Sequence, residues 1–541
     1  MLGLMQRHEL MLSSIIRHAA RQHGGSEVVS FMADGVVHRI NYFDLERRCR
    51  RLAGSMQGLG VCFGDRVGTL AWNDFRHFEL YYGVSGTGAV LNTVNVRLAD
   101  DDVAYVINHA DSKVLFVDPS LIPLLRRIAP LVRDTVRHVV VMSDQATDPD
   151  LPTGMQVHCY EELMARGDDS YVWPEFDEDS ASVLTYTSGT TGRPKGVLYS
   201  HRATMLQSYA VNGADAFGLR AVDRILSCAS MYHATAWTLP YSAPMVGASI
   251  VLPGRRLDGA NLYRMIEGER VTFAFGVPTI WAGFFDHLRS TGGQLSTLKR
   301  VLAGGAPMTR LLIETFREYG VRAETQWGMT ECVLTAYNAP VAATVDFEGD
   351  ALIEMMLRQG RPLFGADLKI ADDDGNELPR DGEAFGTLLT RGHYMIREYY
   401  RQGSEGAADA DNWFSSGDVA TIDENGFVHL VDRAKDLIKS GGEWISSITL
   451  EGIASNHPDV SEAAVIAAEH PKWGERPLLL VVPREGREVS TDSLLAHFKD
   501  KVASWWIPDE VLVVAQLEHT AVGKLNKRVL RARYGNHYSE S

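Results

Sequence analysis

The feature that most constrains the fold is an alternation of short β-rich runs with helical stretches along the chain. Helical patterns at 121–133 and 310–320 lie between such runs, and Gly320 is a typical C-terminal stop for the second helix. Alternation of this kind predicts α/β layers, because each strand is followed by a helix that covers the sheet. The clearest predicted strands are 113–118, 138–143, 182–187, 271–278 and 299–305.

The chain is long enough for more than one folding unit, since 541 residues exceed what a single core usually holds. A polar, small-residue segment at 403–413 predicts a surface loop, and the β-rich pattern restarts at 426–432. We therefore expect a large N-terminal domain at 1–431, a hinge at 432–437 and a small α+β domain at 438–541.

The predicted C-terminal domain has its own pattern of elements. Strands are expected at 463–468 and 478–483. A helix is expected from Asp492 to Val502, with Ser490 or Thr491 as its cap. At the other end of the chain, residues 1–22 mix charged and apolar residues, which predicts an amphipathic helix and not a signal peptide.

Composition excludes several classes of function. The net charge of −16 lacks the basic face of a nucleic-acid binder, and no apolar run approaches the ~20 residues that cross a bilayer. The five cysteines are odd in number and have no paired spacing, which favours reduced thiols in a cytoplasm over a disulfide framework or a zinc site. We expect a cytoplasmic protein without nucleic acid as a partner and without a transmembrane segment.

The stretch TSGTTGRPKG at 187–196 holds three glycines, four hydroxyl side chains and one lysine, a composition suited to phosphate. It is not a Walker P-loop, because Gly189 and Gly192 are too close together and Gly196 follows Lys195 where Ser or Thr is required. The flanks at 182–187 and 197–200 are both strand-like. The sequence therefore predicts a long hairpin loop that wraps phosphates from one side; a plain glycine-rich turn is the alternative.

This stretch resembles the signature [YF]-[TS]-S-G-[ST]-T-G-x-P-K-G of the adenylate-forming enzymes, the acyl-CoA synthetase and luciferase superfamily. Further motifs follow in the family's order over residues 10–535. They are AGGAP (303–307), QWGMTE (326–331), SSGDVA (415–420), DRAKDLIKSGGEWIS (432–446) and TAVGKLNK (520–527). Taken singly, each could be an ordinary turn or a surface charge; their order and number carry the resemblance.

The resemblance implies a large multi-sheet α/β domain with a small mobile C-terminal domain, ATP and CoA as co-substrates and Mg²⁺ as cofactor. Catalytic roles fall on Lys524, Thr330 and Glu331, with Thr187 and Glu331 at the metal. The implied ATP and AMP site is Thr187, Ser188, Gly189, Thr190, Thr191, Gly192, Lys195, Gly305, Ala306, Pro307, Gln326, Trp327, Gly328, Met329, Thr330, Asp418, Arg433, Lys435, Lys439 and Lys524.

Within this resemblance, each group has an expected task. Lys524 would neutralise the attacking carboxylate, Asp418 and Arg433 would reach the ribose, and Lys435 would be the pivot of the hinge. The implied CoA-binding residues are Lys439, Gly441, Gly442, Glu443 and Trp444. The chain continues only briefly past Lys524, with no carrier domain, which favours free CoA as the thiol.

The implied acyl pocket departs from the family. SMYHATAW (230–237) stands where medium- and long-chain fatty acyl-CoA synthetases read P-M-F-H-V-N-A-W, so Ser230 and Thr235 are among the changes. The predicted walls carry no charge, so we expect an acid with an uncharged tail. The pocket residues are Tyr232, His233, Ala234, Trp237, Val277, Gly304 and Gly305.

The stretches 72–95 and 502–510 resemble most the bacterial medium-chain fatty-acid–CoA ligases and methylmercaptopropionate–CoA ligases. The expected reaction is carboxylic acid, ATP and CoA to acyl-CoA, AMP and diphosphate, through an acyl-adenylate. Medium-chain fatty acid is the expected substrate, with methylmercaptopropionate or a long-chain acid as alternatives. The resemblance also implies a homodimer.

Other fates of the adenylate, and other activities of the protein, remain open at this point. The adenylate could pass to a carrier protein or be oxidised, as in luciferase, and a requirement for CoA would separate these. A kinase or phosphohydrolase would release ADP, and the missing Walker pattern argues against it. A non-catalytic nucleotide sensor would bind ATP without exchanging pyrophosphate; the retained motifs argue against that too.

Overall fold

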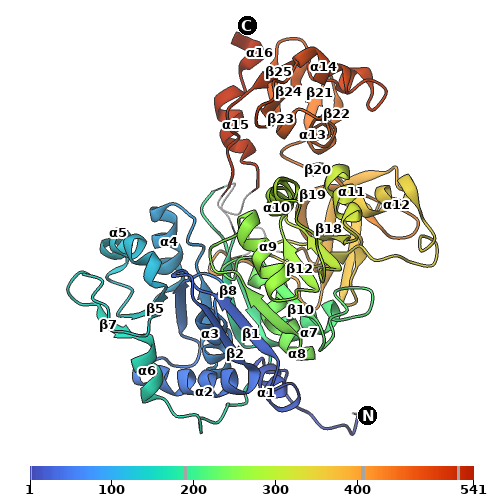
Figure 1. The fold of residues 1–541 in the computed structure, drawn as a ribbon. Coiled ribbons are helices and arrows are strands. Elements are labelled where there is room, and N and C mark those ends of the chain that lie inside the picture. Colours follow the sequence, from blue (N-terminus) through green and yellow to red (C-terminus); the bar gives the residue numbers. More distant parts are fainter. Residues whose placement is uncertain (2, 188–191, 404–407, 521–523, 541) are drawn as a thin grey trace.

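The computed structural model describes residues 1, 3–187, 192–403, 408–520 and 524–540. Their strands form four sheets, of nine, seven, four and five strands. Figure 1 shows the C-terminal residues, in red, as a small separate unit joined to the rest of the molecule next to β20. This is the predicted fold class: a large multi-sheet α/β domain followed by a small α+β domain.

The nine-stranded sheet has the order β16-β15-β14-β13-β12-β10-β11-β1-β2. Strands β14 through β1 in this order run parallel, and the sheet ends in antiparallel strands on both sides. Its strands are β1 (Glu27–Phe31), β2 (Val37–Asn41), β10 (Arg224–Ser227), β11 (Ser249–Leu252), β12 (Phe273–Gly276), β13 (Arg300–Ala303), β14 (Arg322–Trp327), β15 (Ala336–Tyr337) and β16 (Arg361–Pro362).

The seven-stranded sheet has the order β7-β6-β5-β3-β4-β8-β9, with all pairs parallel except the last. The antiparallel pair β8–β9 is the hairpin predicted for the phosphate loop. The strands are β3 (Arg66–Leu70), β4 (Val90–Thr93), β5 (Ser112–Val117), β6 (His138–Val141), β7 (Gln156–Cys159), β8 (Ala181–Tyr186) and β9 (Gly196–Ser200).

Helices connect these parallel strands and bury their apolar sides against the sheets, as expected of α/β layers. Within the described chain, no helix combines the length and the apolar character that a bilayer crossing requires. The helices of this part are α1 (Ser13–Gln22), α2 (Tyr42–Gly58), α3 (Phe75–Gly83), α4 (Asp100–Ala110), α5 (Ile122–Val132), α6 (Tyr160–Arg166), α7 (His201–Val211), α8 (Leu239–Val246), α9 (Gly259–Gly268), α10 (Pro278–Thr291), α11 (Arg310–Glu318) and α12 (Gly349–Leu357), with short 3-10 turns at Ser85–Thr87, Pro119–Leu121 and Ala234–Thr238.

Two smaller sheets complete the molecule. The antiparallel four-stranded sheet contains β17 (Ala366–Ala371), β18 (Phe385–Gly392), β19 (Phe414–Ile422) and β20 (Val428–Arg433). The C-terminal sheet contains β21 (Ile438–Ser440), β22 (Glu443–Ile445), β23 (Val460–His470), β24 (Gly474–Pro483) and β25 (Glu510–Val513), and its helices are α13 (Ser447–Ser455), α14 (Thr491–Ala496), α15 (Lys527–Tyr534) and α16 (His537–Glu540), with a 3-10 turn at Ser504–Trp506.

Two predicted helices were too long. The helix expected at 1–22 is formed only over α1, because the side chains of residues 3–8 are exposed and have no core to cover. The helix expected from Asp492 to Val502 ends at Ala496. Asp500 has φ = 63°, a left-handed conformation that cannot continue an α-helix. The Ser490 cap was predicted correctly, since its side chain accepts from the backbone N–H of Ser493.

Candidate active site

The predicted site residues follow the carboxyl ends of neighbouring parallel strands. In the nine-stranded sheet, β14, β13, β12 and β10 are adjacent. Gln326 and Trp327 end β14, Gly304 and Gly305 follow β13, and Val277 follows β12. Because parallel strands deliver their carboxyl ends to one edge, segments that are far apart in sequence meet there. Ligands of open α/β sheets bind at this edge.

Lys524, from the C-terminal unit, reaches the same edge. A β-carbon placed on Gly305 would lie 3.5 Å from Cγ1 of Val277, 3.8 Å from Cε of Lys524 and 3.9 Å from Cζ2 of Trp237. Gly305 itself has φ = 80°, where a side chain would be strained. The structure thus brings together the predicted adenylation lysine and the predicted acyl pocket around one glycine.

The surroundings of Lys524 make its protonated form less stable than that of an ordinary lysine. Burial first and the Arg433 cation second lower the pKa of its ammonium group to about 8, against the opposing effect of the Asp418 and Glu331 carboxylates. Burial also lowers the pKa of His233 to about 4, with a smaller contribution from Lys524. At neutral pH the site therefore presents one ammonium group beside a neutral imidazole.

Asp418 is fixed by two partners. It is 3% exposed, and its carboxylate pairs with Arg433 Nε at 2.7 Å and accepts from Trp327 Nε1 at 2.8 Å. Asp418 and Arg433 lie opposite each other on β19 and β20. The aspartate and arginine predicted for the ribose are therefore adjacent, and Trp327 orients the carboxylate.

Gln326 is a buried group with an unused acceptor. Its Oε1 has no hydrogen-bond partner within the described part of the chain. A β-carbon on Gly304 would lie 2.0 Å from Gln326 Nε2, so only glycine allows this close approach. A buried acceptor without a partner costs free energy unless a ligand donates to it, which fits an amino-bearing base in the predicted nucleotide site. Ala306 and Pro307 follow Gly305; Ala306 is partly exposed and Pro307 is exposed.

The QWGMTE turn is close-packed around Gly328, where a β-carbon would lie 1.6 Å from the carbonyl oxygen of Val333. Met329 is partly exposed, whereas Thr330 and Glu331 are 6% and 5% exposed. Glu331 Oε1 accepts from the Tyr399 hydroxyl at 2.6 Å, and the Thr330 carbonyl accepts from the Tyr199 hydroxyl. The turn therefore delivers a buried carboxylate to the site.

The phosphate loop is described only at its base. Thr187 and Lys195 close it with two hydrogen bonds, Thr187 N to Lys195 O at 2.9 Å and Lys195 N to Thr187 Oγ1 at 3.1 Å. Gly192 is exposed, with φ = 157°. The four loop residues Ser188, Gly189, Thr190 and Thr191 lie outside the described residues.

Sequence reasoning missed the segment that joins the two nucleotide motifs. Lys195 Nζ lies 4.7 Å from the ring centroid of Tyr399, whose hydroxyl holds Glu331. The backbone N–H of Ile396 donates to Glu331 O at 2.9 Å, and that of Tyr400 donates to Gly196 O at 2.8 Å. No motif or spacing in the sequence marks residues 396–400, since these bonds use mostly backbone atoms.

The metal prediction can be examined on the chemistry of the donors. Mg²⁺ prefers oxygen ligands and is often held by one carboxylate together with phosphate oxygens. The Glu331 carboxylate and the Thr187 hydroxyl supply such oxygens. Within the described residues, no cluster of three or more His, Cys, Asp or Glu side chains forms a metal cage. The residues fit an ion that is shared with a phosphate ligand.

The predicted pocket residues divide into two groups. Trp237 and Val277 lie at Gly305, and Ala234 is 6% exposed beside them in the core. Tyr232 is 2% exposed and packs edge-on against Trp72, with ring centroids 6.2 Å apart, in the core of the seven-stranded sheet. The side chain of Thr235 lies outside the described residues.

The predicted CoA segment lies in the C-terminal unit. Lys439 pairs with Trp444 across the hairpin β21–β22, and Lys439 Nζ lies 5.2 Å from the Trp444 ring centroid. Gly441 and Gly442 form its two-residue turn, with φ = 61° and 96°. Glu443 is exposed, like the other four residues. They form one exposed surface, and within the described residues no hydrogen bond or ion pair joins it to the Lys524 cluster.

The fold and the site define a class: an enzyme whose large domain binds a nucleotide at a sheet edge and whose small C-terminal domain supplies a lysine. The model of the AMP-binding enzyme family matches residues 16–400, and that of the AMP-binding enzyme C-terminal domain matches residues 449–524. The chain belongs to the AMP-binding enzyme family.

Relatives match over almost the full length. A medium-chain-fatty-acid–CoA ligase of Ectopseudomonas oleovorans is 44% identical over 538 residues, covering 99% of this chain and 98% of the relative. A 3-methylmercaptopropionyl-CoA ligase of Ruegeria lacuscaerulensis is 45% identical over 536 residues, covering 99% of each. The crystal structure of the anthranilate CoA ligase AuaEII with anthranoyl-AMP shares the fold, with a TM-score of 0.86, 23% identity and 98% of both chains covered.

Proposed function

We propose that this protein is an ATP-dependent acid–CoA ligase that converts a carboxylic acid, ATP and CoA into acyl-CoA, AMP and diphosphate. The observation that carries the proposal is the position of Lys524 at Gly305, between the apolar wall of Trp237 and Val277 and the carboxylates of Glu331 and Asp418. A cation at that point can pair with an acid whose tail lies along the apolar wall.

The chemistry follows from bringing two anions together. A carboxylate must attack the α-phosphorus of ATP, so the chain has to neutralise charge and align the reacting atoms. Lys524 supplies the positive charge at the attacking oxygen. Neutral His233 adds no competing charge. Lys195 and the hydroxyl groups of the phosphate loop hold the departing diphosphate.

Mg²⁺ is proposed as the metal cofactor, held by Glu331 and Thr187 together with phosphate oxygens. When bound, it offsets negative charge on the triphosphate. Tyr399 keeps the Glu331 carboxylate in place through its hydroxyl. Thr330 lies next to Glu331 in the QWGMTE turn and is proposed to contact the α-phosphate.

The thiol step is proposed to need a different domain orientation. Residues 1–431 would be the large domain, 432–437 the hinge with Lys435 as pivot, and 438–541 the small domain. Rotation about this hinge would withdraw Lys524 and bring the β21–β22 hairpin to the site, where Lys439, Gly441, Gly442, Glu443 and Trp444 would bind CoA.

The acid is proposed to be a medium-chain fatty acid, since the described walls at Trp237 and Val277 are apolar. Methylmercaptopropionate, a long-chain fatty acid, or transfer of the adenylate to a carrier protein are the alternatives. The two relatives named above differ in their acids at nearly equal identity. Identity therefore does not choose between these acids, and a substrate panel is needed.

A homodimer and a cytoplasmic location are proposed as well. The edge strand β2 and its surroundings carry exposed apolar side chains, with Val36, Val37 and Phe43 38–58% exposed, which supports an interface. All five cysteines are unpaired, which supports a reducing compartment. Sedimentation equilibrium tests the first proposal, and fractionation of cells tests the second.

Product analysis tests the proposed function. The enzyme is incubated with ATP, Mg²⁺ and a panel of straight-chain acids plus methylmercaptopropionate, each with and without CoA. AMP, diphosphate and acyl-CoA are expected only when acid and CoA are both present. Release of ADP, or no acid-dependent turnover across the panel, would contradict the ligase proposal; diphosphate without thioester would show that CoA is the wrong acceptor.

A further inference from the structure

The segment that carries Trp237, residues 230–238, has an unusual backbone. Ala234, Ala236, Trp237 and Thr238 have φ values of 39°, 50°, 54° and 65°. These are left-handed conformations that side-chain-bearing residues rarely adopt in succession. Such a backbone persists only where the surroundings hold it, and it is typical of functional sites. We call residues 230–238 the wall segment.

The first clamp on the wall segment is the side chain of Asn73. It is 3% exposed and lies in the loop between β3 and α3, which belong to the other large sheet. Its Nδ2 donates to Ser227 O at 3.1 Å and to Ala229 O at 2.7 Å, and its Oδ1 accepts from Met231 N at 2.8 Å. One amide therefore fixes three alternate residues at the entry to the wall segment.

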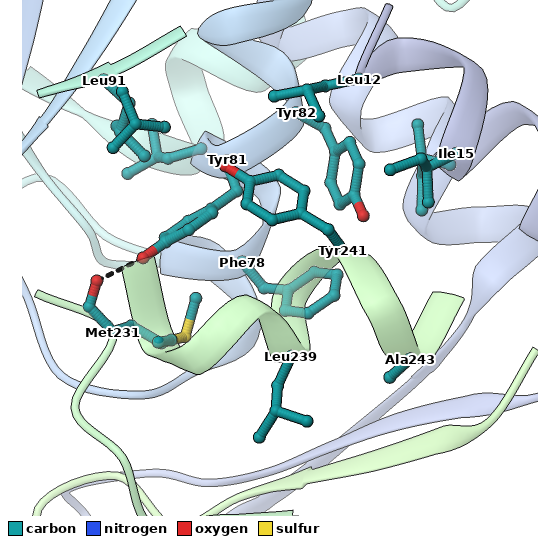
Figure 2. Close-up of a cluster of buried hydrophobic side chains, with 14 of the residues drawn as sticks. Leu12, Ile15, Phe78, Tyr81, Tyr82, Leu91, Met231, Leu239, Tyr241 and Ala243 are labelled. Atoms are coloured by element: carbon teal, nitrogen blue, oxygen red, sulfur yellow. Dashed lines mark hydrogen bonds between the residues drawn. The ribbon is translucent and has the colours of Figure 1, made fainter. Parts of the chain in front are cut away.

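The second clamp consists of two adjacent tyrosines of α3. The hydroxyl of Tyr81 donates to the carbonyl of Met231, which Figure 2 shows as a dashed line. The hydroxyl of Tyr82 donates to Pro240 O at 2.5 Å, just beyond the wall segment. Both rings are fully buried and pack against Tyr241 in the same cluster.

These contacts leave no polar backbone atom of Met231 free, because Asn73 takes its N–H and Tyr81 takes its carbonyl. The left-handed turn is thus held at both ends by side chains of residues 73–82. Trp237 lies inside that turn, and its ring reaches Gly305. Loosening either end would let the ring leave its place beside Lys524.

We propose that Asn73, Tyr81 and Tyr82 are positioning residues that set the shape of the acid pocket by holding the wall segment in its left-handed conformation. The inference rests on the proposed function for the identity of the substrate. The clamp itself depends only on the backbone contacts. Its consequence is that selectivity among acids depends partly on buried residues that never touch the acid.

The test compares Tyr81→Phe with Tyr42→Phe. Tyr42 is a matched control, because it is also fully buried and its hydroxyl also donates to a backbone carbonyl, Ala248 O at 2.5 Å, outside the wall segment. Each variant removes one hydroxyl and leaves one buried carbonyl unpaired, so their losses of stability should be similar. Tyr82→Phe, at the other end of the segment, serves if Tyr81→Phe does not fold.

Two readouts are measured on wild type and both variants: hydrogen exchange of peptides that span 228–241, and KM and kcat for each acid and for ATP. For Tyr81→Phe we expect exchange in that peptide and KM for the preferred acid to rise by about tenfold, the equivalent of one buried hydrogen bond with its unpaired acceptor. KM for ATP should stay unchanged, and Tyr42→Phe should match wild type in both readouts.

The results distinguish a failure of the proposed ligase function from a failure of the proposed positioning role. If wild type forms no acyl-CoA while exchange at 228–241 still rises in Tyr81→Phe only, the proposed function is wrong and the clamp stands. If wild type is active but Tyr81→Phe and Tyr42→Phe show the same exchange and the same KM for the acid, the positioning role is overturned. A rise in exchange with unchanged acid selectivity would also overturn it.

Discussion

Lys524 is the residue on which the proposed chemistry depends most. It belongs to the C-terminal unit, yet its Cε lies next to Gly305 of the large domain. Burial lowers its pKa to about 8, so the ammonium group is desolvated and poised to pair with an incoming carboxylate. Such a group gains most from the charge that develops as the carboxylate attacks.

Replacing Lys524 with alanine should therefore separate the two half-reactions. We expect acid-dependent exchange of pyrophosphate into ATP to fall by about 10²-fold or more, as for other single groups that stabilise charge. Thioester formation from a preformed acyl-adenylate should remain within about threefold, since that step does not use the charge. Lys499→Ala, at an exposed position of the same domain, is the control.

Equal loss of both half-reactions in Lys524→Ala would show that the side chain serves the structure and not adenylation.

The lowered pKa of Lys524 predicts a pH dependence. The group is charged below about pH 8 and neutral above it, whereas an ordinary lysine stays charged to about 10.4. In the free enzyme, kcat/KM for the acid should fall as pH rises through about 8. Bound anions favour the charged form, so the fall in kcat should occur at higher pH.

The matched variant is Lys524→Arg, whose cation does not titrate in this range. Its residual activity should lack the alkaline fall. An alkaline fall at the same pH in both enzymes would assign it to another group.

At the residue level, the motifs could be recognised in the sequence, but the residues that hold the motif side chains in place could not. Lys524, Asp418 and Glu331 stand in short runs whose composition and order are distinctive. Tyr399 and Tyr199 hold Glu331 and Thr330 through single hydroxyl groups, and an isolated tyrosine in a strand or loop carries no signal of its partner. Tyr232, a predicted pocket residue, is buried in the core of the seven-stranded sheet, which an aromatic residue fits equally well.

Among the elements, β14 and the turn after it hold the tightest backbone packing at the site. At Gly328 a β-carbon would lie 1.6 Å from Val333 O, a backbone atom that cannot move aside without moving the turn. Gly328→Ala should destabilise the protein by about 3 kcal/mol or more, as overpacking against backbone does. Urea unfolding followed by tryptophan fluorescence measures the change.

The control is Gly452→Ala in α13, where no atom of the described chain lies within 4 Å of the added carbon. Alanine favours the helix there by up to about 1 kcal/mol. If Gly328→Ala were as stable as this control, the close approach at the turn would be wrong.

Elements with a strong local pattern were predicted well. The hairpin β8–β9 followed from two strand-like runs around a glycine-rich loop, and β23 and β24 from their apolar runs. The start of α1 and the C-terminal end of α14 were not predicted. They depend on where the core stops and on the left-handed turn at Asp500, neither of which periodicity encodes. The packing of Tyr81 onto Met231, between the two large sheets, is likewise set by tertiary contacts.

For the whole molecule, the arrangement of the two domains fits the proposed adenylation step, because Cε of Lys524 lies next to Gly305 of the large domain. Arg531 of α15 bonds to the Lys435 carbonyl and to the Asp436 carboxylate, which ties the proposed hinge to the small domain. Movement of the hinge should therefore carry Lys524 with it.

A proline at the proposed pivot tests this movement, because proline fixes φ near −65° and limits rotation. In Lys435→Pro we expect pyrophosphate exchange to stay within about threefold and acyl-CoA formation to fall by about 10²-fold, since only the second step needs the rotated state. Lys435→Ala should keep both. Normal acyl-CoA formation in Lys435→Pro would rule out this pivot.

The most direct measurement follows an oxygen atom. An acid labelled with ¹⁸O in its carboxylate is converted with ATP, Mg²⁺ and CoA, and the AMP is examined by mass spectrometry. If the carboxylate attacks the α-phosphorus, the thiol then displaces AMP and leaves one labelled oxygen on its phosphate. AMP that carries one ¹⁸O is the expected result. Unlabelled AMP, or label in inorganic phosphate beside ADP, would contradict an acyl-adenylate and with it the role of Lys524.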